Sequence, residues 1–268
     1  MNNYCKFIEV YYNKINNIED IIMIYKEYGQ KNEKVMFFLH GGGLSWWSYE
    51  EVAEKLSEKY RVILPVLDGH GDSDRPFISI KDNAADIISF IEEKFDGHIF
   101  LLGGVSLGAQ IALEILSLKS DICDYAVIES ALVIPSEITA KLIKPMMDSS
   151  YWLINKHWFS RIQFRYLKIR PDLFDKYYED SIKISKENMI SFLKANSLYS
   201  VDSNLHKTNA KTLIISGEKE QKSIIKSADI INRRIPGSCR IEVPGLYHGQ
   251  LSMNNSEKYI LFINDLIK

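Results

Sequence analysis

The sequence predicts an α/β fold, in which a mostly parallel, twisted sheet is flanked by helices, and three observations support this prediction. Short apolar runs of strand length alternate with longer segments whose apolar residues recur at helical spacing. The run at residues 35–39 is apolar without a break, which is typical of a parallel strand covered on both faces. With 268 residues, 46% of them hydrophobic, the chain is long enough for one such domain with an insertion.

The expected elements begin with an antiparallel pair of strands at residues 7–12 and 21–25, joined by a turn at Asn16 and Asn17. Beyond the strand at 35–39 the pattern predicts helix 49–58, strand 61–65, helix 80–95, strand 98–102, helix 109–116 and strand 125–128. Near the end of the chain, it predicts strand 211–216, helix 223–233, strand 240–243 and helix 256–267.

Between residues 135 and 205 the alternation of strands and helices stops. The pattern there is helical throughout and dense in aromatic side chains. We therefore expect an all-helical lid of about four helices, inserted after the sixth strand. The core then comprises residues 1–134 and 206–268, and the lid comprises residues 135–205. Most of the lid aromatics are expected to pack against the core, and a few to line a pocket.

Charge and cysteine content argue against several classes of function. The formal net charge is −2 and the sequence pI is about 6.3, so nothing favours nucleic acid or an anionic membrane as partner. Three scattered cysteines without a C-x-x-C pair indicate free thiols in a reducing compartment rather than a disulfide framework or zinc site. The sequence shows neither a signal-peptide pattern nor an apolar run of membrane-spanning length. We expect a cytoplasmic protein that does not insert into membranes; its oligomeric state cannot be read from the sequence.

The most informative motif is Gly104-Val105-Ser106-Leu107-Gly108, which joins the expected strand at 98–102 to a helical run. A serine on such a sharp turn needs glycine two positions before and two positions after it, because a Cβ there would meet neighbouring backbone. The turn exposes the hydroxyl at the sheet edge and directs the helix N-terminus toward developing negative charge. Ser106 is the candidate nucleophile.

A serine hydroxyl needs a base within hydrogen-bond distance and a group that orients that base. His248 follows the last expected strand, at the sheet edge where Ser106 should lie, and is the candidate base. The orienting acid should follow the strand at 211–216, where both Glu218 and Glu220 qualify. Glu129, just after another strand, is a third candidate.

An oxyanion needs backbone N–H donors. One candidate donor is Leu107, which follows the serine, and the other is Gly42 in the loop His40-Gly41-Gly42-Gly43, where the absence of side chains allows a substrate oxygen to approach. His40 is expected to brace that loop. Trp46 and Trp47 follow it directly and are candidates for the wall of a substrate pocket, although packing under the lid explains them as well.

These motifs, in this order and around a helical insertion, resemble those of the α/β-hydrolase fold superfamily over nearly the whole chain. The matching segments are Leu39-His40-Gly41-Gly42-Gly43, Gly69-His70-Gly71-Asp72-Ser73, Gly104-Val105-Ser106-Leu107-Gly108, Gly217-Glu218-Lys219-Glu220 and Tyr247-His248. The resemblance implies a Ser106–His248–Glu220 triad with oxyanion donors at Gly42 and Leu107. It places glutamate where most members carry aspartate.

The resemblance implies a serine hydrolase that cleaves a small carboxylic ester, thioester or lactone and needs no cofactor or metal. Cleavage of a carbon–carbon bond remains open, because the same triad serves it. A second class also remains open, namely a ligand-sensing or regulatory protein on the same fold with slow or no turnover. The lid aromatics favour an apolar or aromatic substrate group of modest size.

Overall fold

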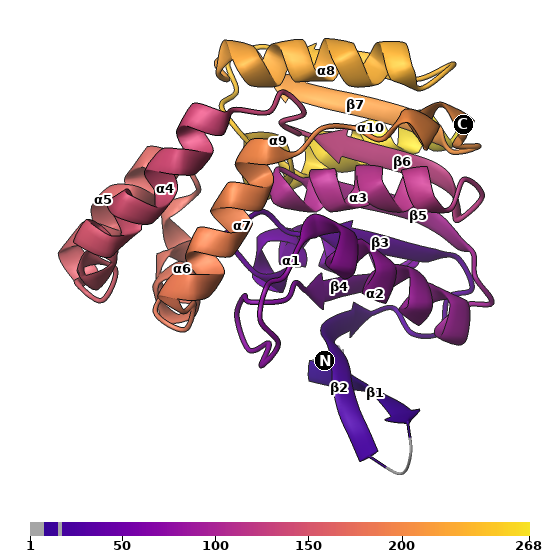
Figure 1. Ribbon diagram of the computed structural model, residues 1–268. Coiled ribbons are helices and arrows are strands. Elements are labelled where there is room, and N and C mark those ends of the chain that lie inside the picture. Colours follow the sequence, from indigo (N-terminus) through magenta and orange to yellow (C-terminus); the bar gives the residue numbers. More distant parts are fainter. Residues whose placement is uncertain (1–7, 16–17) are drawn as a thin grey trace.

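The computed structural model describes residues 8–15 and 18–268. Within them, eight strands form one sheet in the order β1-β2-β4-β3-β5-β6-β7-β8 (Figure 1). The strands are β1 (Ile8–Ile15), β2 (Ile18–Tyr28), β3 (Val35–Leu39), β4 (Arg61–Val66), β5 (Ile99–Val105), β6 (Cys123–Glu129), β7 (Lys211–Gly217) and β8 (Cys239–Val243).

Strand β2 runs antiparallel to both of its neighbours, β1 and β4, and all pairs from β4 to β8 are parallel. The mostly parallel sheet with an antiparallel start is therefore as the sequence predicts. Both early strands are longer than expected. Phe7 and the expected turn at Asn16 and Asn17 lie outside the described residues.

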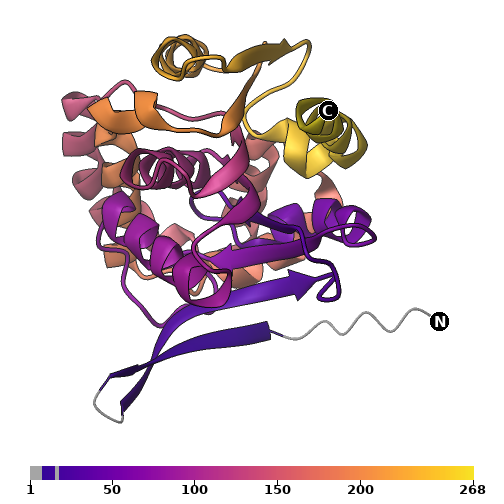
Figure 2. The same cartoon turned by 90° about the vertical axis from the view of Figure 1, so that its right-hand side faces the viewer.

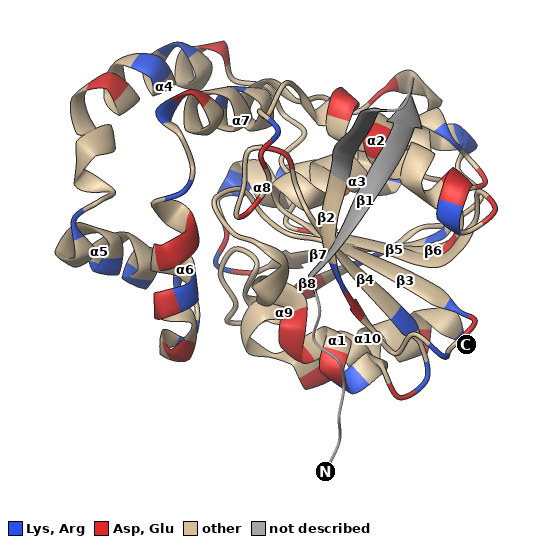
Figure 3. Cartoon of the chain, turned by 90° about the horizontal axis from the view of Figure 1, so that it is seen from below, with Lys and Arg blue, Asp and Glu red and all other residues tan. Residues whose placement is uncertain are grey.

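Helices cover the sheet on both faces (Figure 2). On one face, buried side chains of α2 (Ile80–Lys94), α3 (Leu107–Leu118) and α8 (Lys222–Arg234) pack into a core with the sheet. On the other face, α1 (Glu50–Leu56) and α10 (Ser256–Ile267) form a second core. Charged residues lie mainly on helices and loops, while the central strands β3 and β5 carry none (Figure 3). Every residue of β3 is buried, and so is every residue of β5 except the half-buried Phe100.

Four helices connect β6 to β7 and lie beyond the carboxyl ends of the parallel strands (Figure 1). They are α4 (Glu137–Ser150), α5 (His157–Leu167), α6 (Phe174–Ser181) and α7 (Lys186–Leu198), with short 3-10 turns between them. Serine caps mark two of their starts: Ser136 accepts the N–H of Thr139, and Ser185 accepts the N–H of Asn188. Helix α4 packs mainly on α7, and α5 contacts α6.

Candidate active site

Ser106 occupies a strained turn between β5 and α3. Its φ of 55° and ψ of −114° lie in a region that side-chain-bearing residues rarely adopt. The turn is possible because of its glycines: a Cβ on Gly104 would lie 2.4 Å from the carbonyl oxygen of Gly108, and one on Gly108 only 2.1 Å from that of Leu39. The N–H of Ser106 donates to the carbonyl of Glu129 at 2.9 Å, which fixes the turn to β6.

His248 lies on the loop between β8 and the short helix α9 (Gln250–Asn254), which the sequence patterns do not predict. Its Nε2 is 2.9 Å from Oγ of Ser106. Gly249 follows with φ of 65°, the left-handed conformation in which glycine carries no Cβ penalty, and turns the chain into α9. The expected base and nucleophile, 142 residues apart in sequence, are thus in hydrogen-bond contact.

Glu220 completes the chain of hydrogen bonds from the loop after β7. Its Oε2 is 2.8 Å from Nδ1 of His248, and its side chain is fully buried. Its Oε1 accepts the N–H of Gly217 at 2.8 Å and the hydroxyl of Ser130 at 2.7 Å. A carboxylate only accepts hydrogen bonds, so Nδ1 carries the imidazole proton and Nε2 is free to accept the Ser106 hydroxyl proton.

The other two candidate acids make different contacts. Glu218 is exposed and accepts the N–H of Gly245 at 2.7 Å, so it links the loops after β7 and β8. Glu129 is buried, and its Oε1 accepts the N–H groups of Leu251 and Ser252 at the start of α9. Burial raises the pKa of Glu129 to about 7. Only Glu220, of these three, contacts His248.

Ser130, which the sequence patterns did not single out, connects three parts of the site. Besides donating to Glu220, its hydroxyl accepts the N–H of Gly249 at 3.1 Å, next to His248. Its φ of 57° is again left-handed, and its N–H donates to Ile215 in β7. Its position directly after β6, at the carboxyl edge of the sheet, is the signal that would have identified it.

The glycine loop after β3 lies against the Ser106 turn. A Cβ on Gly41 would lie 3.6 Å from that of Ser106, and one on Gly42 would lie 3.5 Å from the Leu107 side chain. The buried His40 braces this loop, since its Nε2 accepts the N–H of Leu67 at 3.1 Å, which leaves Nδ1 to donate to the Gly41 carbonyl at 2.9 Å. Burial lowers the pKa of His40 to about 3, so the ring stays neutral while it does so.

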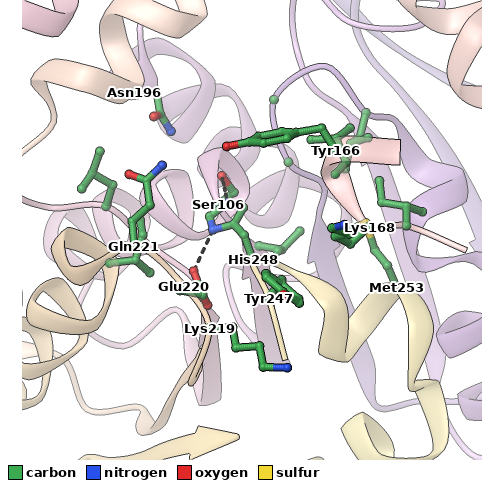
Figure 4. Close-up of a pocket in the computed structure, with 18 residues that line it drawn as sticks. Ser106, Tyr166, Lys168, Asn196, Lys219, Glu220, Gln221, Tyr247, His248 and Met253 are labelled. Atoms are coloured by element: carbon green, nitrogen blue, oxygen red, sulfur yellow. Dashed lines mark hydrogen bonds and ion pairs between the residues drawn. The ribbon is translucent and has the colours of Figure 1, made fainter. Parts of the chain in front are cut away.

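These groups open onto a cavity of about 470 Å³ (Figure 4). The glycine loop, the Ser106 turn, the loops of Glu220 and His248, and helices α5 and α7 all contribute residues to its wall. The lining residues are Gly41, Gly42, Leu44, Val105, Ser106, Leu132, Tyr166, Leu167, Lys168, Ile169, Asn196, Lys219, Glu220, Gln221, Ile224, Tyr247, His248 and Met253. The wall is mainly apolar, with polar groups near Ser106.

The expectation that Trp46 and Trp47 wall the cavity is wrong, because neither residue lines it. Trp47 is buried in an apolar cluster that shares Leu44, Ile169 and Met253 with the cavity wall. Its indole N–H donates to Asp180 of α6 at 2.7 Å. The Trp46 ring packs beside this cluster, with the ammonium of Lys26 4.8 Å from its centroid. A short 3-10 helix (Trp46–Tyr49) begins after Leu44 and Ser45, and it places Trp47 in this cluster and Trp46 against it.

Of the cysteines, Cys123 is buried and Cys239 is exposed, both as free thiols, and Cys5 lies outside the described residues. Across residues 8–15 and 18–268, no group of His, Cys, Asp and Glu side chains is arranged to hold a metal ion. In the same part of the chain, no helix has the length and apolar character needed to cross a bilayer.

A family model described as "Alpha/beta hydrolase family" matches residues 36–257. No curated protein matches the sequence. Among solved structures, the chain is similar to an esterase from Exiguobacterium antarcticum, with a TM-score of 0.77, 20% identity and 98% of each chain covered. It is similar to a thermophilic esterase from Thermogutta terrifontis, with a TM-score of 0.75, 16% identity and 100% of each chain covered. A bromoperoxidase from Bacillus anthracis has a TM-score of 0.78 at 20% identity, covering 96% of this chain and 100% of its own. At these identities the likeness is one of fold.

Proposed function

Because the chain belongs to the alpha/beta hydrolase family, we propose that it is a serine hydrolase of carboxylesterase type. In this proposal it cleaves a small carboxylic ester or thioester through an acyl intermediate on Ser106. The observation that carries the proposal is the unbroken hydrogen-bond chain from Ser106 Oγ to His248 and on to Glu220, at 2.9 and 2.8 Å. Two of the similar solved structures are esterases, which is consistent with this choice.

In the proposed reaction, Ser106 attacks the carbonyl carbon while Nε2 of His248 takes the hydroxyl proton. Buried Glu220 holds the imidazole in the required tautomer and stabilises the imidazolium that forms. The N–H groups of Gly42 and Leu107 bind the oxyanion, and a well-placed donor of this kind lowers the barrier by about 3 kcal/mol. His248 then gives its proton to the leaving group, and water repeats the cycle on the acyl-serine.

We also propose that residues 135–205 act as a lid on a core formed by residues 1–134 and 206–268. Support comes from the cavity, because Tyr166 and Leu167 of α5 and Asn196 of α7 face residues of the core across it. The amide of Gln110 in α3 donates to the carbonyl of Asn196 at 3.0 Å and ties α7 to the helix that begins at Ser106. The shape of these helices then selects the substrate.

The test is labelling of the folded chain by a fluorophosphonate, a reagent that reacts readily with the activated serine of serine hydrolases. We expect labelling of the wild type and none of Ser106→Ala or His248→Ala. A series of p-nitrophenyl esters of rising acyl length then measures turnover. A labelled chain that turns over no ester, thioester or diketone would favour the ligand-sensing alternative. A folded chain that is not labelled would overturn the proposal.

A further inference from the structure

Two lysine side chains line the cavity close to His248. Lys168 follows α5, and Lys219 precedes Glu220 on the loop after β7. Their ammonium nitrogens lie 5.8 and 5.4 Å from the centroid of the same ring, that of Tyr247. Figure 4 shows Lys168 on one side of Ser106, and Asn196 and Gln221 on the other. The cavity therefore has a cationic side and a neutral polar side.

The backbone of Lys168 is held firmly in an unusual conformation. Its φ of 58° is left-handed, a conformation that a side chain with a Cβ disfavours. Its carbonyl oxygen accepts two side-chain amides, from Gln250 at 2.7 Å and Asn254 at 2.8 Å. This carbonyl ends α5, so the two amides of α9 replace the helical partners that it lacks. The side chain of Lys168 consequently leaves the helix end at a fixed place beside the cavity.

The same contacts fix Lys168 relative to Tyr247 and Lys219. The Gln250 amide that binds the Lys168 carbonyl through Nε2 accepts the N–H of Tyr247 through Oε1, at 2.9 Å. The N–H of Lys219 donates to the carbonyl of Leu246 at 2.9 Å, which joins the loops of Glu220 and His248. Both lysine side chains thus start from backbone that is tied to the loops of the proposed acid and base.

The charge of the cavity is not balanced by the protein. Glu220 is the one acidic residue among the described residues that line it. Its side chain is fully buried, and its two oxygens accept from Ser130, Gly217 and His248. Among the described residues, no carboxylate forms an ion pair with Lys168 or Lys219. The accessible charge is therefore positive, and it attracts an anion.

We propose that Lys168 and Lys219 form an anion subsite over the Tyr247 ring, and that the substrate is an ester or thioester with a carboxylate or phosphate group away from the reacting carbonyl. This inference deepens the proposed function and rests on it. Lysine binds either anion as a point charge, so the two groups share one chemistry here. The tyrosine ring supplies the apolar surface for the carbons between the anion and the carbonyl.

The first test compares kcat/KM for matched pairs of substrates. For a carboxylate, the pair is mono-4-nitrophenyl glutarate and neutral 4-nitrophenyl valerate. For phosphate, it is butyryl-coenzyme A and the neutral S-butyryl-N-acetylcysteamine. In at least one pair we expect the wild type to have a higher kcat/KM for the anionic substrate. The Lys168→Gln/Lys219→Gln double variant should lower that preference about tenfold, which is the effect expected from the loss of two exposed ion pairs. Raising the salt concentration should lower it as well.

Lys156→Gln is the matched control, because Lys156 is exposed at the start of α5 and does not line the cavity. It should keep the wild-type preference. An equal preference in wild type and double variant, for both pairs, would overturn the anion subsite while leaving the esterase proposal intact.

A binding measurement separates the two proposals further, because it needs no turnover. Calorimetry with Ser106→Ala should detect glutarate or coenzyme A, and the two lysine substitutions added to it should weaken that binding about tenfold. Unchanged or undetectable binding of both anions would count against the subsite. Failure of the proposed function would instead show as absent fluorophosphonate labelling and no hydrolysis of the neutral valerate ester.

Discussion

The hydroxyl of Ser130 donates to Oε1 of Glu220 at 2.7 Å, while the other carboxylate oxygen contacts His248. The two carboxylate oxygens of Glu220 therefore have different partners: Oε1 is held by the protein, and Oε2 contacts the imidazole of His248. Together with the Gly217 N–H, Ser130 fixes the first of these oxygens. Glutamate has one more rotatable bond than aspartate, and these contacts remove that freedom.

Substitution Ser130→Ala should therefore lower kcat for ester hydrolysis about tenfold, since it removes one charge-assisted hydrogen bond to the acid. KM should change little, because Ser130 does not line the cavity. Ser216→Ala is the control: this serine is also buried, but its hydroxyl has no hydrogen-bond partner within the described residues. A fall in kcat of equal size in both variants would show a general loss of packing instead.

Glu220→Gln should lower kcat by about 10³-fold or more with little change in fold, because the amide keeps the shape of the carboxylate but favours the wrong imidazole tautomer. Steady-state kinetics and circular dichroism measure the two quantities. Glu218→Gln, two residues earlier, should leave kcat near the wild-type value, since Glu218 contacts only the Gly245 N–H. Comparable losses in the two variants would mean that the acid has been misassigned.

Glu129 should make stability depend on pH. Its pKa is raised to about 7 from the ordinary value of 4.5, mainly because burial disfavours the charged form. Between these values the folded chain holds a proton that the unfolded chain has released, so the free energy of unfolding falls as pH rises, by roughly 1 kcal/mol per pH unit. The contribution is fully present below the unfolded pKa and lost above the folded one.

Urea titrations of the wild type and Glu129→Gln at pH 5, 6, 7 and 8 check this dependence. The glutamine can still accept the N–H groups of Leu251 and Ser252, but it does not titrate. The difference in unfolding free energy between the two chains should therefore change from pH 5 to 7 and then level off. A difference that is constant over the whole range would contradict the raised pKa.

Gly108→Ala should destabilise the fold by about 3 kcal/mol or more, because the added Cβ meets the Leu39 carbonyl at 2.1 Å, where backbone must shift. Gly237→Ala is the control for backbone strain without a steric clash. Gly237 has a φ of +72°, which disfavours alanine, but an added Cβ there would meet no atom within 4 Å beyond its chain neighbours. It should cost about 1 kcal/mol. Urea midpoints compare the two, and equal shifts would exclude crowding as the cause.

Strand positions in the centre of the sheet were readable from the sequence because β3 and β5 are buried on both faces and therefore apolar without interruption. Helix α9 was not predicted. It is five residues long and follows the left-handed Gly249, so it has too few residues for a helical period to appear. The two early strands were predicted too short, since pairing along β1 and β2 extends beyond their apolar residues.

The sequence by itself determined the fold family and singled out the candidate serine and histidine, since the glycines that permit the turn are local requirements and the order of strands sets the sheet edge. The proposal of Glu220 over Glu218 and Glu129 as the acid needed the tertiary structure, because it depends on which carboxylate reaches Nδ1 of His248 across two loops. The packing of Trp46 and Trp47, the contact of Ser130 with Glu220 and the approach of Lys168 and Lys219 to the Tyr247 ring were decided there too. These contacts join residues that are distant in sequence, so a local sequence pattern does not predict them.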